Sequence, residues 1–182
     1  MKRSLRLLLS AVLSLGLAAA AFGSTADNAR LEQRLNNEVR HALVMIPQFG
    51  VFDNLSYRVD GSTVTLYGQV RDAIVKDAAA SSVKRLEGVQ KVDNRIQILP
   101  ASFNDDRIRA QVARAVFGDP RLSSYAIEPV PPIHIIVENG RVNLVGVVRT
   151  QAEKDSAFIR ANGVPGVFSV NNNLQVEQPA KG

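Results

Sequence analysis

The sequence predicts an α+β protein of two tandem αββαβ units, each a three-stranded sheet covered by two helices on one face. The first observation is a repeat: residues 59–98 align with residues 137–176 at a constant offset of 78, without a gap and with fourteen identical positions. The second is a β-hairpin signal in each copy, and the third is an apolar helical stripe on each side of that hairpin. A period of 78 is too long for a solenoid and suits two small domains.

The chain begins with a segment typical of secretory signal peptides, which we place at residues 1–23. Three basic residues within the first six precede an apolar run at residues 7–21, and small residues follow it. The run is shorter than the roughly 20 residues of an ordinary membrane span. We expect cleavage after Ala21 or Gly23, and the alternative is an uncleaved membrane anchor.

Charge and cysteine content narrow the class of protein. The chain carries a net charge of +5, but three of its 22 basic residues lie in the expected signal peptide, which leaves +2 for the rest. So small a charge, together with export, argues against a nucleic-acid partner. There is no cysteine, so we expect apolar cores without disulfides and an exported, soluble protein that is not a lipoprotein.

The first domain is expected at residues 28–99 and opens with a helix over residues 28–46, closed by Pro47. Two alternating strands follow around Asp60–Gly61, a common hairpin turn pair. The helix is predicted from six apolar residues at helical spacing. These residues are Leu31, Leu35, Val39, Ala42, Leu43 and Ile46.

A second helix and a last strand complete this domain. The helix carries Val75, Ala79, Val83 and Leu86 on one stripe, and Gly88 leads into a strand over residues 89–99. One glycine, Gly68, stands inside the second hairpin strand, where glycine weakens a strand. We interpret it as a place where a helix approaches the sheet closely.

The second domain is expected at residues 104–177, after a linker at residues 100–106 and before a polar tail at residues 178–182. Its first helix is expected to be capped by Asn104 or Asp105. Its apolar stripe consists of Ile108, Val112, Ala115 and Val116.

The remaining elements of the second domain match those of the first. Asn139–Gly140 is its hairpin turn signal, and Gly146 repeats the strand glycine. The second helix carries Ala157, Ala161 and Val164 on its buried stripe. Gly166 leads into the last strand.

These motifs resemble the BON-domain family, and they occur twice in the same order over nearly the whole chain after the signal peptide. The shared features are an apolar strand with an internal glycine, a helix, a Gly-Val pair and a last strand with an asparagine between apolar positions. Their fold-hallmark residues here are Gly68, Gly88, Asn94, Gly146, Gly166 and Asn172.

The resemblance implies a periplasmic protein with a part in envelope maintenance or in osmotic and envelope stress. It also implies binding to phospholipid membrane surfaces or to envelope proteins. It implies neither catalysis nor a cofactor, and it provides no set of catalytic residues.

The residues themselves give no sign of an enzyme or a metal site. The two histidines, His41 and His134, have no motif neighbours that would complete a metal site or a catalytic dyad. Asp105–Asp106 suits the dipole at a helix start better than acid–base catalysis. Gly163–Gly166 has the spacing of an RNA-binding KH loop, but it follows a helix and precedes a strand, so Gly163 is interpreted as a helix stop.

A binding face is predicted on the helix around Ala157. On a helical wheel, Phe158 and Ile159 lie off the buried stripe, and Lys154 and Arg160 lie near them. Exposed apolar residues beside cations suit a membrane contact or a partner site. The alternative is that this face packs against the other domain. A second functional hypothesis is a periplasmic chaperone that holds unfolded exported proteins.

Overall fold

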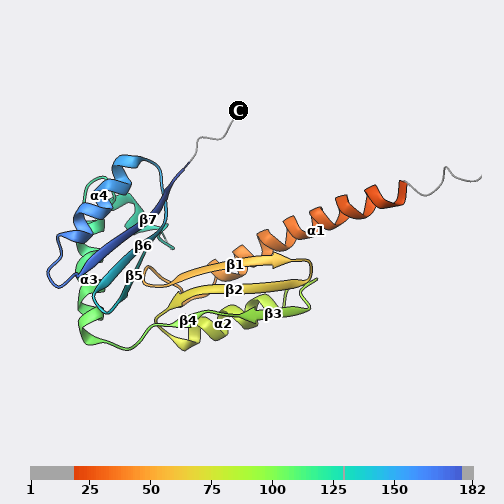
Figure 1. The fold of residues 1–182 in the computed structure, drawn as a ribbon, viewed down its shortest axis with the longest axis horizontal. Helices are drawn as coiled ribbons and strands as arrows, with labels where there is room; N and C mark the ends of the chain where they lie inside the picture. Colours follow the sequence, from red (N-terminus) through yellow and green to blue (C-terminus); the bar gives the residue numbers. More distant parts are fainter. Residues whose placement is uncertain (1–18, 129, 178–182) are drawn as a thin grey trace, which may run out of the picture.

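The computed structural model describes residues 19–128 and 130–177 and contains two αββαβ units, as predicted (Figure 1). Residues 1–18 of the expected signal peptide and the expected polar tail lie outside the described residues. The elements of the first unit are α1 (Ala19–Val44), β1 (Asn54–Asp60), β2 (Thr63–Val70), α2 (Ala73–Lys84), β3 (Lys91–Asn94) and β4 (Gln97–Ile98). Those of the second are α3 (Phe103–Phe117), the short 3-10 helix η1 (Ser123–Ile127), β5 (Ile133–Glu138), β6 (Arg141–Val148), α4 (Gln151–Asn162) and β7 (Ser169–Val176).

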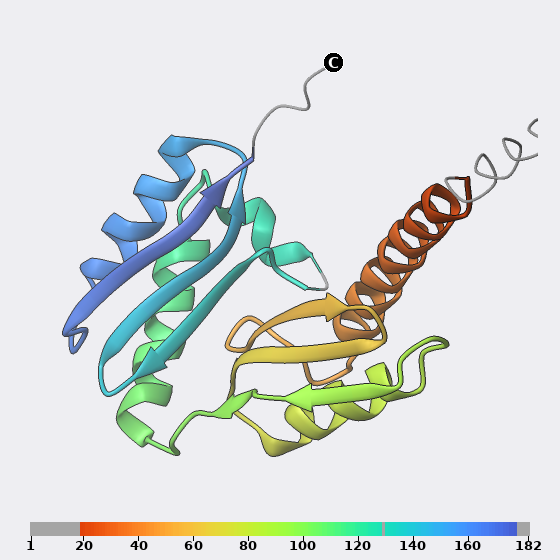
Figure 2. The same cartoon turned by 45° about the vertical axis from the view of Figure 1, so that its right-hand side comes forward.

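Each sheet is built around a middle strand. β2 pairs antiparallel with β1 and parallel with β3 and β4, and β6 pairs antiparallel with β5 and parallel with β7. In both units the two helices lie behind the strands in Figure 2 and leave the other face of the sheet open. The predicted last strand of the first unit is interrupted at Arg95–Ile96, whereas β7 is continuous.

Each unit has its own apolar core between its helices and its sheet. Leu66 is fully buried in the first core and Leu144 in the second. The predicted helical stripes face these cores, since Val75, Ala79 and Val83 are buried on α2. Alternation along the strands and helical spacing therefore located both cores.

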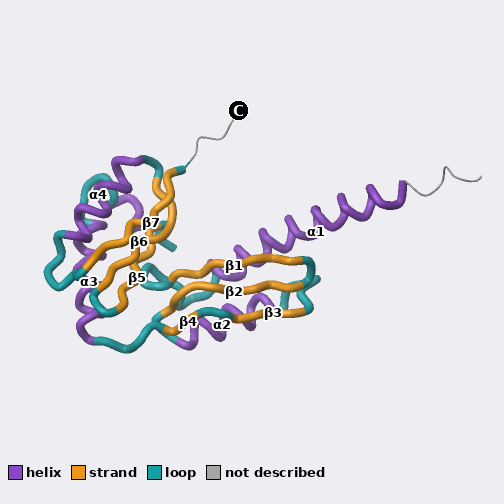
Figure 3. The backbone as a smooth tube through the Cα atoms, in the orientation of Figure 1, coloured by secondary structure: helices purple, strands orange, loops and turns teal. Residues whose placement is uncertain are grey.

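Helix α1 is longer than predicted. It begins at Ala19 rather than residue 28 and includes the expected cleavage positions, Ala21 and Gly23. In Figures 1 and 3 its first turns project beyond the sheet, and its C-terminal part lies against the unit. Leu35, Val39 and Leu43 are buried in that C-terminal part and hold it against the unit.

The start of α3 corrects two predictions. The helix begins at Phe103, so the linker ends before residue 106, and Ser102 is the N-cap, with its side chain accepting from Asp105 N at 3.2 Å. Asp105 is buried, and its carboxylate accepts hydrogen bonds from the turn amides of Asn139 at 2.9 Å and Gly140 at 2.8 Å. This aspartate therefore ties α3 to the β5–β6 hairpin and does not cap the helix.

Close helix packing is the wrong explanation for the strand glycines. Gly68 and Gly146 have φ angles of +125° and +126°, which favour glycine. A Cβ on Gly68 would lie 1.9 Å from Asn54 O, and one on Gly146 would lie 1.9 Å from Pro132 O. Asn54 is the first residue of β1, and Pro132 directly precedes β5. The glycines therefore accommodate the backbone of the neighbouring strand rather than a helix.

The hallmark asparagines tie the last strand to the second helix. Asn94 donates its side-chain amide to Lys76 O at 3.0 Å, and Asn172 donates to Lys154 O at 2.8 Å. In the first unit, Asn94 Oδ1 also accepts from Ile96 N at 3.2 Å. The repeated asparagine is thus explained by the fold rather than by ligand binding.

Replacing Gly146 with valine is expected to unfold or strongly destabilise the second unit, by more than about 2 kcal/mol, because a side chain there meets backbone and requires an unfavourable φ. Hydrogen exchange resolved by segment will measure the effect, and β1 and β2 should keep their protection. Gly163→Ala is the matched control, because a Cβ at Gly163 has ordinary contacts, the nearest 3.6 Å from Ile159 O. A loss below about 0.5 kcal/mol for Gly146→Val would refute this account.

Candidate functional site

The outer side of α4 carries the predicted apolar residues in exposed positions. Ile159 is 67% exposed and Phe158 is 38% exposed, while Ala157 and Ala161 are fully buried beneath them. The capping box of Thr150 and Glu153 fixes the start of the helix and so determines which residues face outward. We call the set Lys154, Phe158, Ile159 and Arg160 the α4 face.

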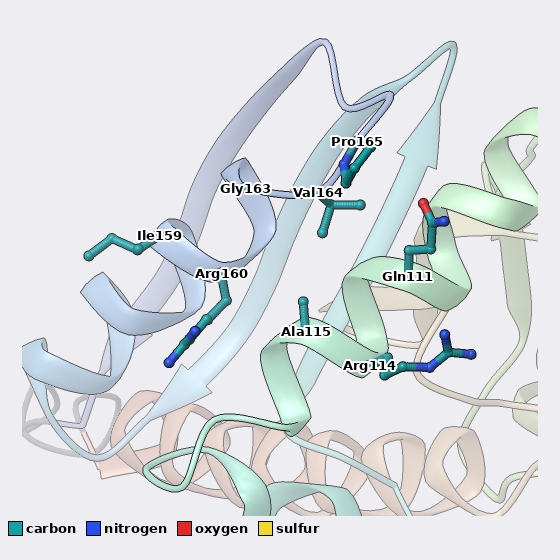
Figure 4. Close-up of a pocket in the computed structure, with 8 residues that line it drawn as sticks. All are labelled: Gln111, Arg114, Ala115, Ile159, Arg160, Gly163, Val164 and Pro165. Carbon is teal, nitrogen blue, oxygen red and sulfur yellow. The ribbon is translucent and has the colours of Figure 1, made fainter.

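A groove runs beside this face between α3 and α4, with a volume of about 460 Å³ (Figure 4). The α4 side contributes Ile159 and Arg160, and the helix end and following loop contribute Gly163, Val164 and Pro165. The α3 side contributes Gln111, Arg114 and Ala115. The groove therefore joins an exposed apolar residue to two arginines, a combination that a sequence pattern on α4 alone did not reveal.

One polar atom of the groove lining has no hydrogen-bond partner among the described residues. Gln111 Oε1 is buried and accepts no hydrogen bond there. Its neighbour Arg114, one turn further along α3, is exposed. The groove thus presents an amide and a guanidinium beside apolar side chains.

The two cations of the α4 face differ in their partners. Arg160 Nε lies 2.9 Å from Asp119 Oδ2, and Asp119 is only 3% exposed. Lys154 is half-buried and forms no ion pair within the part of the chain that the structure describes. Arg160 therefore has a structural task that the sequence did not predict, and Lys154 is the cation left for an external charge.

The carboxylate of Asp119 is held in its charged form by several donors. The Arg121 backbone amide donates to it at 2.9 Å, and this hydrogen bond is the largest cause that lowers the pKa of Asp119. The ion-paired hydrogen bond from Arg160 lowers this pKa further. Asp119 lies just after α3, so the pair also holds α4 against the end of that helix.

The alternative that the α4 face packs against the other unit is wrong. Contacts between the units lie at β5, where Ile135 N donates to Val51 O at 2.7 Å, and at an ion pair of 3.2 Å between Arg71 and Asp106. Helix α4 packs on α3, β6 and β7 of its own unit and lies away from the first unit in Figure 1. Its outer side chains therefore face outward.

The other residues considered for chemistry have structural surroundings. His41 is exposed on α1, whereas the ring of His134 contacts the first unit, and the two histidines are not brought together. Asp106 pairs with Arg109 at 2.7 Å, and Gly163 ends α4 as predicted. No group of three or more potential metal ligands lies close together among residues 19–128 and 130–177.

Sequence reasoning missed two arginines that each lie over an aromatic ring. Arg149, after β6, lies over the ring of Tyr125 at 4.8 Å and donates Nε to the Tyr125 hydroxyl at 3.1 Å. Tyr125 in turn donates to the buried carboxylate of Glu153 at 3.0 Å. Arg71 holds the equivalent position and lies 5.7 Å from the ring of Phe52. The identity of Arg71 and Arg149 in the repeat was the available signal.

Comparison with known proteins identifies the units. The sequence model described as "BON domain" matches residues 27–100 and again residues 104–178. In the described part of the chain, no helix has the length and apolar character needed to cross a membrane.

Two curated relatives are similar to this chain in sequence. The outer membrane lipoprotein DolP of Haemophilus influenzae is 32% identical over 153 residues, which cover 81% of this chain and 74% of the relative. The osmotically-inducible protein Y of Escherichia coli is 31% identical over 126 residues, covering 68% of this chain and 62% of that protein. The match thus spans less than two thirds of the second relative.

Among solved structures, CdsD, a structural protein of the type III secretion system of Chlamydia trachomatis, is similar at 15% identity. The match covers 80% of this chain and 94% of that chain, with a TM-score of 0.28. At this TM-score the similarity carries no structural conclusion.

Replacing Arg160 with glutamine is expected to lower the melting temperature at pH 7, because buried Asp119 loses an ionic partner. The lowered pKa of Asp119 contributes stability that is present above the ordinary pKa of about 3.8 and is lost as the pH falls through the lowered value. The difference in melting temperature between wild type and Arg160→Gln should therefore narrow at pH 3. Lys154→Gln is the control and should change little at either pH. An Arg160→Gln difference that is constant with pH would contradict this assignment.

Proposed function

The chain belongs to the BON-domain family, and on that premise we propose that it is a non-catalytic periplasmic protein that binds phospholipid membrane surfaces or envelope proteins through the α4 face. The observation that carries the proposal is the exposure of Phe158 and Ile159 beside the α3–α4 groove. Both side chains are exposed in the part of the chain that the structure describes, so their apolar area is available to a partner.

Apolar burial supplies the larger part of the proposed affinity. Transfer of a large apolar side chain from water is worth roughly 1.5–3 kcal/mol when burial is complete. Ile159 has most of its surface to bury and Phe158 about a third. A helix that lies in the interface with its apolar side inserted is an established mode of peripheral membrane contact.

Positive charge beside the apolar residues sets the preference for the charge of the membrane. Lys154 lies one turn before Phe158 on α4, and a cation close to an anionic membrane contributes about 1 kcal/mol, which salt screens. Arg160 contributes less than its charge suggests, since Asp119 neutralises it at 2.9 Å. We therefore expect anionic surfaces to be preferred over neutral ones.

The names of the relatives support the proposed role in the cell. One is named as an outer membrane lipoprotein and the other as osmotically inducible, which supports a part in envelope maintenance or in osmotic and envelope stress. The matching family is not one of enzymes. We propose a periplasmic location, which the signal-like segment at residues 1–23 supports.

A periplasmic chaperone that holds unfolded exported proteins is the second candidate. Large apolar side chains are also exposed away from α4, and Phe103 and Ile127 are 98% and 85% exposed. A holding chaperone would use such dispersed apolar surface and would have little preference for lipid charge.

The double change Phe158→Ser, Ile159→Ser is expected to weaken binding to anionic vesicles by tenfold or more, because it removes the apolar area that the membrane would cover. Vesicle flotation of the mature chain at several salt concentrations will measure it, with melting temperature as the check on folding. Ile74→Ser is the matched control: Ile74 is 57% exposed on α2, so binding should stay unchanged. Lys154→Gln should flatten the salt dependence.

Three outcomes would count against the membrane function. The first is that wild-type protein binds neither anionic nor neutral vesicles. The second is equal weakening by Ile74→Ser. The third is suppression of aggregation of an unfolded client that is unaffected by vesicles and by the double change, which would favour the chaperone.

A further inference from the structure

The two units meet where a segment of the first lies along the edge of β5. Residues 49–53, between α1 and β1, carry Val51, whose carbonyl accepts from Ile135 N at 2.7 Å. Val51 and Phe52 pack against the core of the second unit. This contact resembles the addition of a short strand to a sheet edge. We call residues 49–53 and β5 together the joint.

His134 lies at the centre of the joint. Its ring stacks on Phe49, with centroids 5.3 Å apart and an angle of 29° between the planes. Its Nδ1 lies 3.2 Å from Gly50 O, so Nδ1 carries the hydrogen and donates to that carbonyl. A single side chain of the second unit thus contacts two residues of the segment.

Asp53 is the charged group that acts on this ring, and it connects to further charges between the units. Asp53 is buried, and its carboxylate accepts from Gly50 N at 3.1 Å and Arg71 N at 2.8 Å. The Arg71 guanidinium reaches across to Asp106 at 3.2 Å. On β6 the residue opposite His134 is Val145, which has no charge.

Two opposing effects act on the proton equilibrium of His134. Burial in the joint lowers its pKa and is the largest effect, while the Gly50 carbonyl and the charge of Asp53 act in the opposite direction. The net result is a pKa below the ordinary value of 6.5. The closed joint therefore prefers the neutral ring.

We propose that His134 makes the joint acid-sensitive, so that protonation of its ring releases residues 49–53 from β5 and lets the two units move apart. This inference is independent of the α4 face, which does not take part in the joint. Opening would break the hydrogen bond from Ile135 N to Val51 O and would expose the edge of β5.

The pH window follows from linkage between protonation and closure. Above about 6.5 the ring is neutral in both the closed and the open joint, and closure has its full stability. As the pH falls below 6.5, the open state takes up a proton more readily than the closed state, and closure weakens. The weakening levels off once the pH is below the lowered pKa of the closed state. Aspartate side chains in peptides titrate near 3.9, below most of this window.

The absence of native cysteine makes the joint directly measurable. Spin labels on Lys84→Cys in α2 and Asn162→Cys at the end of α4, both exposed positions, report the distance between the units by double electron–electron resonance. The chain has two histidines, so NMR can follow both ring titrations in the same mature protein. We expect a narrow distance distribution at pH 7.5 that broadens toward pH 4.5 with the midpoint of the His134 ring titration.

Three variants test the residue. His134→Phe keeps the stacking and His134→Asn keeps a donor for Gly50 O, and neither can titrate, so at least one should keep a narrow distribution through the whole range. His41→Gln is the matched control and should broaden as the wild type does.

A wild-type distribution that stays unchanged while His134 titrates would overturn the proposal. So would broadening in both His134 variants with the wild-type midpoint. If both variants are already broad at pH 7.5, the wild-type titration decides. Coincident midpoints for the broadening and for the His134 ring support an acid-sensitive joint, and separate midpoints refute it.

Discussion

Both units depend on a middle strand that pairs antiparallel with one neighbour and parallel with the other. β2 and β6 each run antiparallel to the strand before them and parallel to the strand after them. A parallel neighbour requires a crossover connection, and here the second helix supplies it. The helix packs on the sheet through its small buried residues, Ala79 in α2 and Ala157 in α4. The asparagine of the last strand then bonds that helix, which closes the unit.

This constraint explains why one phrase occurs twice, as VTLYGQVR and VNLVGVVR. Its alternate apolar residues face the helices, and Leu66 and Leu144 are fully buried there. Its glycine stands where the neighbouring backbone leaves no space for a side chain. Its arginine, after the strand, stacks on an aromatic ring from the segment before the hairpin. Each repeated position thus has a local physical reason, and none of these reasons requires a ligand.

The predictable features are those that depend on neighbours in the sequence. Helical spacing and alternation gave the elements and cores, and the outward direction of Phe158 and Ile159 followed from the helical wheel. Features that depend on distant backbone were missed or misread. Gly146 contacts Pro132 rather than a helix, and Asp105 bonds a hairpin turn far along the chain. The Arg160–Asp119 pair likewise joins residues 41 positions apart, which no local pattern encodes.

The two copies have diverged where the fold permits it, and this separates their tasks. The first copy has Ala80 and Ser81 where the second has Phe158 and Ile159, so the two large apolar side chains at these positions occur in the second copy alone. The first copy instead contributes residues 49–53, which lie against β5. In the second sheet β5 and β7 lie on opposite sides of β6, and α4 packs on β6 and β7. A partner on the α4 face therefore need not displace the first unit, and the joint can open without disturbing that face. The proposed binding face and the proposed acid-sensitive joint therefore lie on different elements of the second unit.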